Sequence, residues 1–290
     1  MFLQKYSQKS ERNLNLKKFN YHTHSVFCDG ENTPLEIVQK ALKLGISELG
    51  FSGHASMLPL PGNDTFYCMT AENTIEYRKE ISQLKKNFSD KIKIFCGIEK
   101  DYFSSDSFGD YDFIIGSVHY IEHNGDFFDV DLDKKKMVEA IEHHWNGKSD
   151  DFAADYFRLV KSIYEKTQCD IIGHFDLLTK FNENHDIFDE KSDKYLSAAE
   201  EAVNTLAKND VLFEVNTGAI SRGYRTTPYP SPEIMKMIKS AGGKVTFSSD
   251  CHKADNLLYG FDNALSYIKS FGFDSFSTLE LHKQTQGLIG

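Results

Sequence analysis

Histidine and carboxylate side chains recur at the ends of short apolar segments of this sequence. His22 and His24 are separated by one residue, and so are Asp250 and His252. Residues i and i+2 of a strand point to the same side, so each pair could present two donor atoms in one direction. Imidazole and carboxylate together suit zinc, manganese or iron, whereas magnesium and calcium prefer mostly oxygen. Single donors end four further segments, at His54, Glu99, His119 and His174.

With Asp29 added, the candidate metal ligands are more numerous than one ion can use. They are His22, His24, Asp29, His54, Glu99, His119, His174, Asp250 and His252. We expect them to hold two or three divalent transition-metal ions (zinc, manganese or iron), with some carboxylates bridging. Three such ions would exceed the charge of the carboxylates by about three, so the site would attract a phosphate group.

An isolated histidine is more often a surface residue or a hydrogen-bonded core residue than a metal ligand. The donors described above are different, because donors stand at the ends of six apolar segments. A non-ligand interpretation would require six independent coincidences. Asp29 carries less weight alone, since Cys-Asp-Gly-Glu is also an ordinary turn sequence. We accept the non-ligand interpretation for His123, His143, His144, His185 and His282.

These donors need a fold that brings the ends of many strands together. Short apolar runs alternate with helical patterns, which is typical of repeated βα units arranged in an α/β barrel. Thr33-Pro34-Leu35-Glu36 and Ser231-Pro232-Glu233 are helix starts, and Gly45 ends the first helix. Amphipathic stretches predict helices over 72–88, 152–166 and 191–208. The seven predicted strands are 19–24, 48–53, 92–99, 111–119, 169–174, 211–216 and 244–249.

Two segments interrupt the βα rhythm, and we expect both to be active-site loops. Segment 57–70 carries two prolines and a glycine, and segment 120–151 mixes charged residues with the single tryptophan. Both follow a predicted strand, where the functional loops of barrels lie. No repeat or linker divides the sequence, so residues 1–290 are expected to form one domain.

Composition excludes several classes of function. The formal net charge of -10 gives no basic surface for nucleic acid, although bound metals could still attract a small anionic substrate. Residues 1–19 lack the apolar stretch of a signal peptide or membrane helix, so we expect a cytoplasmic protein. The five cysteines form no C-x-x-C pair and are expected to be reduced. The sequence favours no particular oligomeric state.

Six ordered segments resemble the polymerase and histidinol phosphatase (PHP) superfamily. They are His22-Thr-His24-Ser, Gly53-His54, Gly97-Ile-Glu99, Gly116-Ser-Val-His119, Gly173-His174 and Asp250-Cys-His252. Within it, segments 110–120, 173–178 and 214–218 most resemble the histidinol-phosphate phosphatases. Some relatives carry histidine at the position of Asp29. A carboxylate oxygen is a harder donor than an imidazole nitrogen, so this difference would make the ligand set of one ion harder.

The resemblance implies a distorted seven-stranded (β/α)7 TIM-like barrel with a trinuclear metal site. It assigns His22, His24, Glu99 and Asp250 to one ion, Asp29, His54 and His252 to a second, and His119 and His174 to a third that shares Glu99.

The implied reaction is hydrolysis of L-histidinol phosphate to L-histidinol and phosphate, a step of histidine biosynthesis. A hydroxide that bridges two metals would attack phosphorus. Asp250 is the candidate acceptor of the water proton, Glu99 the bridging carboxylate, and His252 a candidate to assist the leaving alkoxide.

Substrate-binding residues are expected among the few cations and aromatics near these segments. Arg222, Arg225 and Lys180 could grip phosphate oxygens, although Arg225 could equally be a solvated loop residue. Tyr120 and Phe27 adjoin predicted ligands and could stack on an imidazole, but such aromatics are more often packing residues.

Two alternative functions remain open at this point. One is another phosphoesterase of the same scaffold, acting on a nucleotide, a phosphodiester or phosphotyrosine in protein. The other is a non-catalytic metal-binding module, which the complete set of ligand residues argues against.

Overall fold

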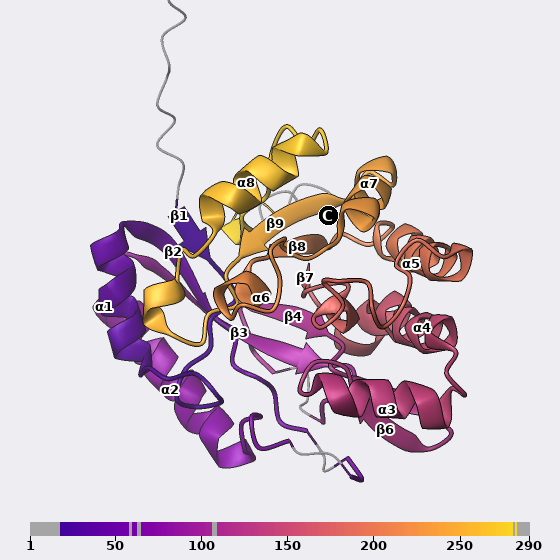
Figure 1. Ribbon diagram of the computed structural model, residues 1–290. Coiled ribbons are helices and arrows are strands. Elements are labelled where there is room, and N and C mark those ends of the chain that lie inside the picture. The colour runs from indigo at the N-terminus through magenta and orange to yellow at the C-terminus, as the bar shows by residue number, and fades with distance from the viewer. Residues whose placement is uncertain (1–17, 58–59, 63–64, 106–108, 281, 283–290) are drawn as a thin grey trace, which may run out of the picture.

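The computed structural model describes residues 18–57, 60–62, 65–105, 109–280 and 282 (Figure 1). Seven parallel strands form one sheet in the order β1-β2-β3-β4-β7-β8-β9. Each predicted run overlaps one of them, so the prediction of seven barrel strands is confirmed. Their bounds are Lys18–Asn20, Ile46–Phe51, Lys93–Asp101, Phe113–Ser117, Ile171–Ile172, Leu212–Asn216 and Lys244–Ser248.

The first and last strands meet just beyond their C-terminal ends. Thr23 and Cys251 form an isolated parallel bridge, in which His24 N–H donates to Cys251 O at 3.0 Å. Cys251 N–H donates in turn to His22 O at 3.2 Å. These bonds close the barrel between two segments that carry predicted metal ligands, and they fix the two segments against each other.

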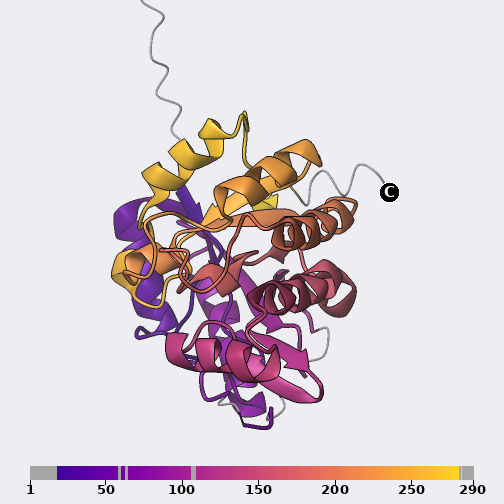
Figure 2. The same cartoon turned by 45° about the vertical axis from the view of Figure 1, so that its right-hand side comes forward.

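Helices cover the outside of the sheet, as Figures 1 and 2 show. The capping box of Thr33 and Glu36 starts α1 as predicted, and Gly45 ends it with φ of 71°. Predicted helices over 72–88, 152–166 and 191–208 correspond to α2, α4 and α5 within about three residues. The helix bounds are α1 Pro34–Leu44, α2 Ala71–Asn87, α3 Lys134–His144, α4 Ser149–Thr167, α5 Asp193–Leu206, α6 Gly218–Ser221, α7 Pro232–Ser240 and α8 Phe261–Ser270.

Segment 120–151, expected as an active-site loop, carries regular secondary structure and contributes Asp131 and Leu132 to the pocket described below. It contains an antiparallel hairpin of β5 (Tyr120–His123) and β6 (Asp126–Asp129), followed by α3. Asn124 and Gly125 both have positive φ, as a tight hairpin turn requires. The predicted loop 57–70 lies partly outside the described residues, and its described part contributes Phe66 and Tyr67 to the site discussed below.

The core of the protein is apolar on both sides of the sheet. Strand residues such as Leu49, Ile98, Ile115 and Val215 are fully buried between the barrel interior and the surrounding helices. All five cysteines are free, in agreement with the sequence-based expectation. Among the described residues, no helix is long and apolar enough to cross a membrane.

Candidate metal centre and substrate pocket

All nine predicted ligands lie at the C-terminal ends of the parallel strands, where barrel enzymes carry their sites. Their donor atoms form four overlapping groups, and within each group the atoms lie within 4.8 Å of one another. Glu99 lies within β3, and the others follow strands: His22, His24 and Asp29 after β1, His54 after β2, His119 after β4, His174 after β7, and Asp250 and His252 after β9.

Glu99 stands at the centre of this cluster and is 1% exposed. Its Oε2 lies 3.2 Å from His22 Nε2 and 3.0 Å from His54 Nδ1. Its Oε1 lies 3.0 Å from His174 Nε2 and 3.6 Å from His119 Nε2. The two oxygens of one carboxylate therefore face two different sets of imidazoles, which is the geometry that a bridging ligand needs.

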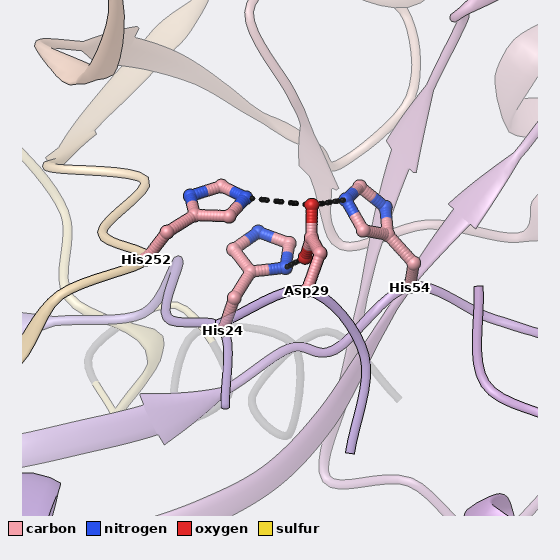
Figure 3. A group of neighbouring side chains, drawn as sticks. All are labelled: His24, Asp29, His54 and His252. Atoms are coloured by element: carbon pink, nitrogen blue, oxygen red, sulfur yellow. Dashed lines mark ion pairs between the residues drawn. The ribbon is translucent and has the colours of Figure 1, made fainter. Parts of the chain in front are cut away.

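Asp29 lies between His252 and His54 and beside His24 (Figure 3). Its Oδ2 lies 3.2 Å from His252 Nε2 and 3.7 Å from His54 Nε2, and its Oδ1 lies 3.5 Å from His24 Nδ1. These four residues come from three separate segments of the chain. The turn Cys-Asp-Gly-Glu is thus both an ordinary turn and a source of one donor.

The second nitrogen of His22 explains how that imidazole is oriented. His22 Nδ1 is 2.7 Å from Glu214 Oε1, which holds the Nδ1 proton and directs Nε2 toward Glu99 and Asp250, where it could ligate a metal once deprotonated. A carboxylate partner of this kind is usual for metal-bound histidine. Within the described part of the chain, His22 Nε2, His24 Nε2 and Glu99 Oε2 are buried without a hydrogen bond. Buried polar atoms that lie close together without hydrogen-bond partners are suited to binding a shared cation.

The charges of the cluster shift the pKa values of its imidazoles in opposite directions. Burial alone would lower the pKa of His119, but the Asp101 hydrogen bond and the Glu99 and Asp131 charges raise it to about 9. Burial, assisted by the neighbouring His252 and His54, lowers the pKa of His24 to about 3. In the metal-free protein some ligands therefore carry protons near neutral pH.

Asp250 and His252 do not form the strand pair that their spacing suggested. Strand β9 ends at Ser248, and Asp250 has φ of 46°, in the left-handed region that aspartate tolerates better than most residues. The turn still places Asp250 Oδ1 3.3 Å from His24 Nε2. The two donors converge because of this turn, not because of strand alternation.

Arg222 lies against the same turn. Its Nη1 donates to Asp250 O at 3.0 Å, and its Nη2 lies 3.1 Å from Asp250 Oδ2. The Arg222 side chain is 30% exposed and lines the pocket, so the guanidinium can reach a bound anion. Burial would raise the pKa of Asp250, but the charges of Arg222 and His22 hold it well below its usual value.

A cavity of about 220 Å³ opens above the ligands. Lys180, predicted to bind substrate, lines it, and Lys180 Nζ donates to Asp131 O at 2.6 Å. Tyr67 packs edge-on against His54, with ring centroids 4.9 Å apart. The lining residues other than the predicted metal ligands are Phe66, Tyr67, Asp131, Leu132, Leu177, Lys180 and Arg222.

Arg225 and Tyr120 are not among the residues that line this cavity. Arg225 is 6% exposed, and its Nη1 donates to Thr179 O at 2.9 Å, so it braces the turn that carries Lys180. Tyr120 is fully buried beside Tyr67. Both residues are therefore buried and lie outside the pocket lining.

Phe27 also makes a different contact from the imidazole stacking considered for it. Its ring packs edge-on against Tyr77 on α2, with centroids 5.9 Å apart. Phe27 therefore belongs with the packing aromatics, as the sequence alternative allowed.

Four polar residues support the site and were not singled out from the sequence. Ser117 Oγ donates to Glu99 Oε1 at 2.6 Å, and Asp101 Oδ2 accepts from His119 N–H at 2.7 Å. Glu214 and Asp131 complete the set. A usable signal existed for Asp101, which follows Glu99 by two residues in one strand, and for Glu214, an acid inside an apolar strand.

The remaining histidines lie outside the cluster, in agreement with the sequence interpretation. His123 Nδ1 lies 3.0 Å from Asp155 Oδ2, and His185 is an exposed residue whose Nδ1 lies 3.4 Å from Glu190 Oε1. His282 is buried against Asp210 O, while His143 and His144 are exposed on α3.

Comparison with known proteins agrees with this architecture. The family model described as "PHP domain" matches residues 20–218. This chain belongs to the PHP domain family. The histidinol-phosphatase of Lactococcus lactis is 27% identical over 276 residues, which cover 91% of this chain and 94% of that protein.

Two solved structures share the fold of this PHP protein. A structure from Listeria monocytogenes has a TM-score of 0.74 at 22% identity, covering 85% of this chain and 99% of that one. The histidinol phosphate phosphatase of Lactococcus lactis, complexed with zinc, L-histidinol and phosphate, has a TM-score of 0.64 at 24% identity. It covers 90% of this chain and 96% of the other. At these identities the likeness concerns the fold, a nearly closed seven-stranded βα barrel.

Proposed function

We propose that this protein is a metal-dependent phosphomonoesterase that hydrolyses L-histidinol phosphate to L-histidinol and phosphate. The observation that carries the proposal is the convergence of nine metal-ligand residues beneath a pocket that also holds Arg222 and Lys180. The names of the Lactococcus lactis relatives support the choice of substrate.

The nine ligands would hold two or three divalent ions, with Glu99 shared between them. Zinc is bound in the Lactococcus lactis structure, and the mixture of imidazole and carboxylate also suits manganese or iron. When bound, the ions supply a water of lowered pKa as nucleophile and neutralise charge on the phosphate.

The protein's own residues would bind the phosphate and move its protons. Arg222 is held by the carbonyl and the carboxylate of Asp250, so its remaining N–H groups can bind phosphate oxygens. Arg222 and His22 keep Asp250 ionised, so it has no proton of its own and is the proposed acceptor of the water proton, although its lowered pKa makes it a weaker base than a free carboxylate. His252 directs Nε2 at Asp29, so it suits a ligand better than a proton donor.

A substrate panel tests the proposal. We expect kcat/KM for L-histidinol phosphate to exceed that for nucleotides, sugar phosphates and bis-aryl diesters at least about tenfold, which is roughly 1.4 kcal/mol of discrimination. A flat profile over the monoesters would remove the substrate assignment.

Metal removal tests the mechanism separately. Chelation should abolish activity, and manganese, zinc or iron should restore it. Full activity in an exhaustively metal-stripped sample would contradict metal dependence. No turnover of any phosphoester by the metal-loaded protein would favour a non-catalytic module.

A further inference from the structure

Asp131 is a carboxylate that lines the pocket without belonging to the nine ligand residues. It follows the β5–β6 hairpin, where Val130 N–H donates to His119 O at 3.0 Å. This bond places Asp131 beside the part of the centre formed by His119 and His174. The Asp131 side chain is 19% exposed, so a bound molecule can reach it.

Lys180 contacts Asp131 without using all of the accepting capacity of the carboxylate. Lys180 Nζ donates to the main-chain oxygen of Asp131 at 2.6 Å and lies 3.2 Å from Oδ2. A carboxylate accepts about four hydrogen bonds, so the Lys180 contact leaves Oδ1 and part of the capacity of Oδ2 for another donor. Burying a carboxylate next to a substrate costs free energy unless the substrate offers a donor or positive charge.

The surroundings of Asp131 differ from those of the phosphate-binding end. Arg222 lies at the Asp250 turn, whereas the pocket lining that contains Asp131 also contains Leu132 and Leu177. Leu132 is 48% exposed. A pocket wall that carries both a carboxylate and apolar side chains suits an organic group that combines carbon atoms with one positive charge.

We propose that Asp131 binds a cationic group on the leaving alcohol, so that the pocket selects phosphomonoesters of amino alcohols. The proposal rests on the proposed function, in which the leaving alcohol, L-histidinol, carries an amine on the carbon next to its CH₂–O group. Asp131 is a specificity-determining residue in this account, and Lys180 remains available to the phosphate.

Paired substrates that differ only in the amine separate this role from a structural one. We would compare L-histidinol phosphate with its deamino analogue, and O-phosphoethanolamine with ethyl phosphate, in the metal-loaded wild type and in D131N. The substitution keeps the shape of the side chain and removes its charge. We expect the wild type to prefer the amine-bearing member of each pair at least about tenfold, and D131N to lose most of that preference.

K180Q is the matched control, because it removes the charge that Asp131 contacts. It should lower kcat/KM for both members of each pair to a similar extent. If D131N also lowered both members equally, Asp131 would only position Lys180, and the proposal would be overturned.

The wild-type comparison stands even where D131N is poorly folded. Equal rates for O-phosphoethanolamine and ethyl phosphate in the wild type would contradict the proposal. The wild type could prefer the amine-bearing member of both pairs and still hydrolyse L-histidinol phosphate slowly. That result would support an amine-binding subsite and contradict only the assignment of L-histidinol phosphate as the substrate.

Discussion

Arg222 Nη2 lies 3.1 Å from Asp250 Oδ2, and Arg222 Nη1 lies 3.0 Å from the carbonyl oxygen of the same residue. One guanidinium thus contacts both the side chain and the main chain of a predicted metal ligand. The contact fixes the direction of the guanidinium toward the pocket. It also keeps Asp250 ionised, so the carboxylate can accept but not donate hydrogen bonds.

Substitution Arg222→Ala should raise KM for substrate and lower kcat together. A charge-assisted contact contributes about 1.5–3 kcal/mol, so kcat/KM should fall by roughly one to two orders of magnitude. Inhibition by inorganic phosphate should weaken, while metal content stays near that of the wild type. Arg158→Ala, an exposed arginine on α4, is the control. An unchanged kcat/KM in the Arg222 variant would contradict this role, and phosphate binding would then be assigned to Lys180.

Glu99→Gln should remove metal and activity together. The substitution deletes a charge that faces two sets of imidazoles and leaves an amide that cannot bridge two cations equally well. We expect activity to fall on the order of a hundredfold or more, with fewer ions per chain by elemental analysis. Glu142→Gln changes an exposed glutamate on α3 in the same way and should have no effect. Full metal content in the Glu99 variant would exclude its bridging role.

Glu214→Gln tests whether the residue behind His22 matters for the metals. Glu214 Oε1 accepts from His22 Nδ1, and Oε2 accepts from His174 N–H at 2.8 Å. An amide can preserve only one of these acceptors, so His22 would lose its fixed orientation. Metal affinity should fall roughly ten- to a hundredfold. Competition with a fluorescent chelator would measure this, and an unchanged affinity would restrict Glu214 to a packing role.

Gly218→Ala should misplace the Arg222–Asp250 pair without removing either residue. A Cβ atom at position 218 would lie 2.8 Å from Asp250 Oδ2 and 3.0 Å from Arg222 Nη2, closer than such atoms approach. Displacements of this size cost about ten- to a hundredfold in rate. We expect kcat/KM to fall by that amount while the far-ultraviolet circular dichroism stays unchanged. Wild-type kinetics in Gly218→Ala would show that the pair can shift freely.

Metal binding at pH 7 should release protons. The pKa of His119 is raised to about 9, and Glu214, Glu99 and Asp250 outweigh burial to raise the pKa of His22 well above its usual value. Both imidazoles are therefore protonated at pH 7 before metal arrives, and both must become neutral to coordinate. A pH indicator in weakly buffered solution would record the release. Metal affinity should fall as the pH is lowered, and a pH-independent affinity would argue against these ligands.

The sequence alone identified the nine donors and the seven strands. Every donor except Asp29 ends or follows an apolar run, and the carboxyl ends of parallel strands must meet at one side of a barrel. Because of this topology, residues between His22 and His252 that lie far apart in the chain come together in one cluster. The helix caps at Thr33 and Gly45 were equally predictable, because capping is a local interaction of a few adjacent residues.

Only the tertiary structure decided which polar residues support that cluster and which cations reach the pocket. Glu214 contacts His22 and Asp131 contacts Lys180, and no local pattern records a partner many residues away. Arg222 and Arg225 stand three residues apart in one loop, yet the first lines the pocket and the second braces Thr179. The sequence determines that both arginines are charged, whereas the path of the loop determines which side of the pocket wall each guanidinium occupies.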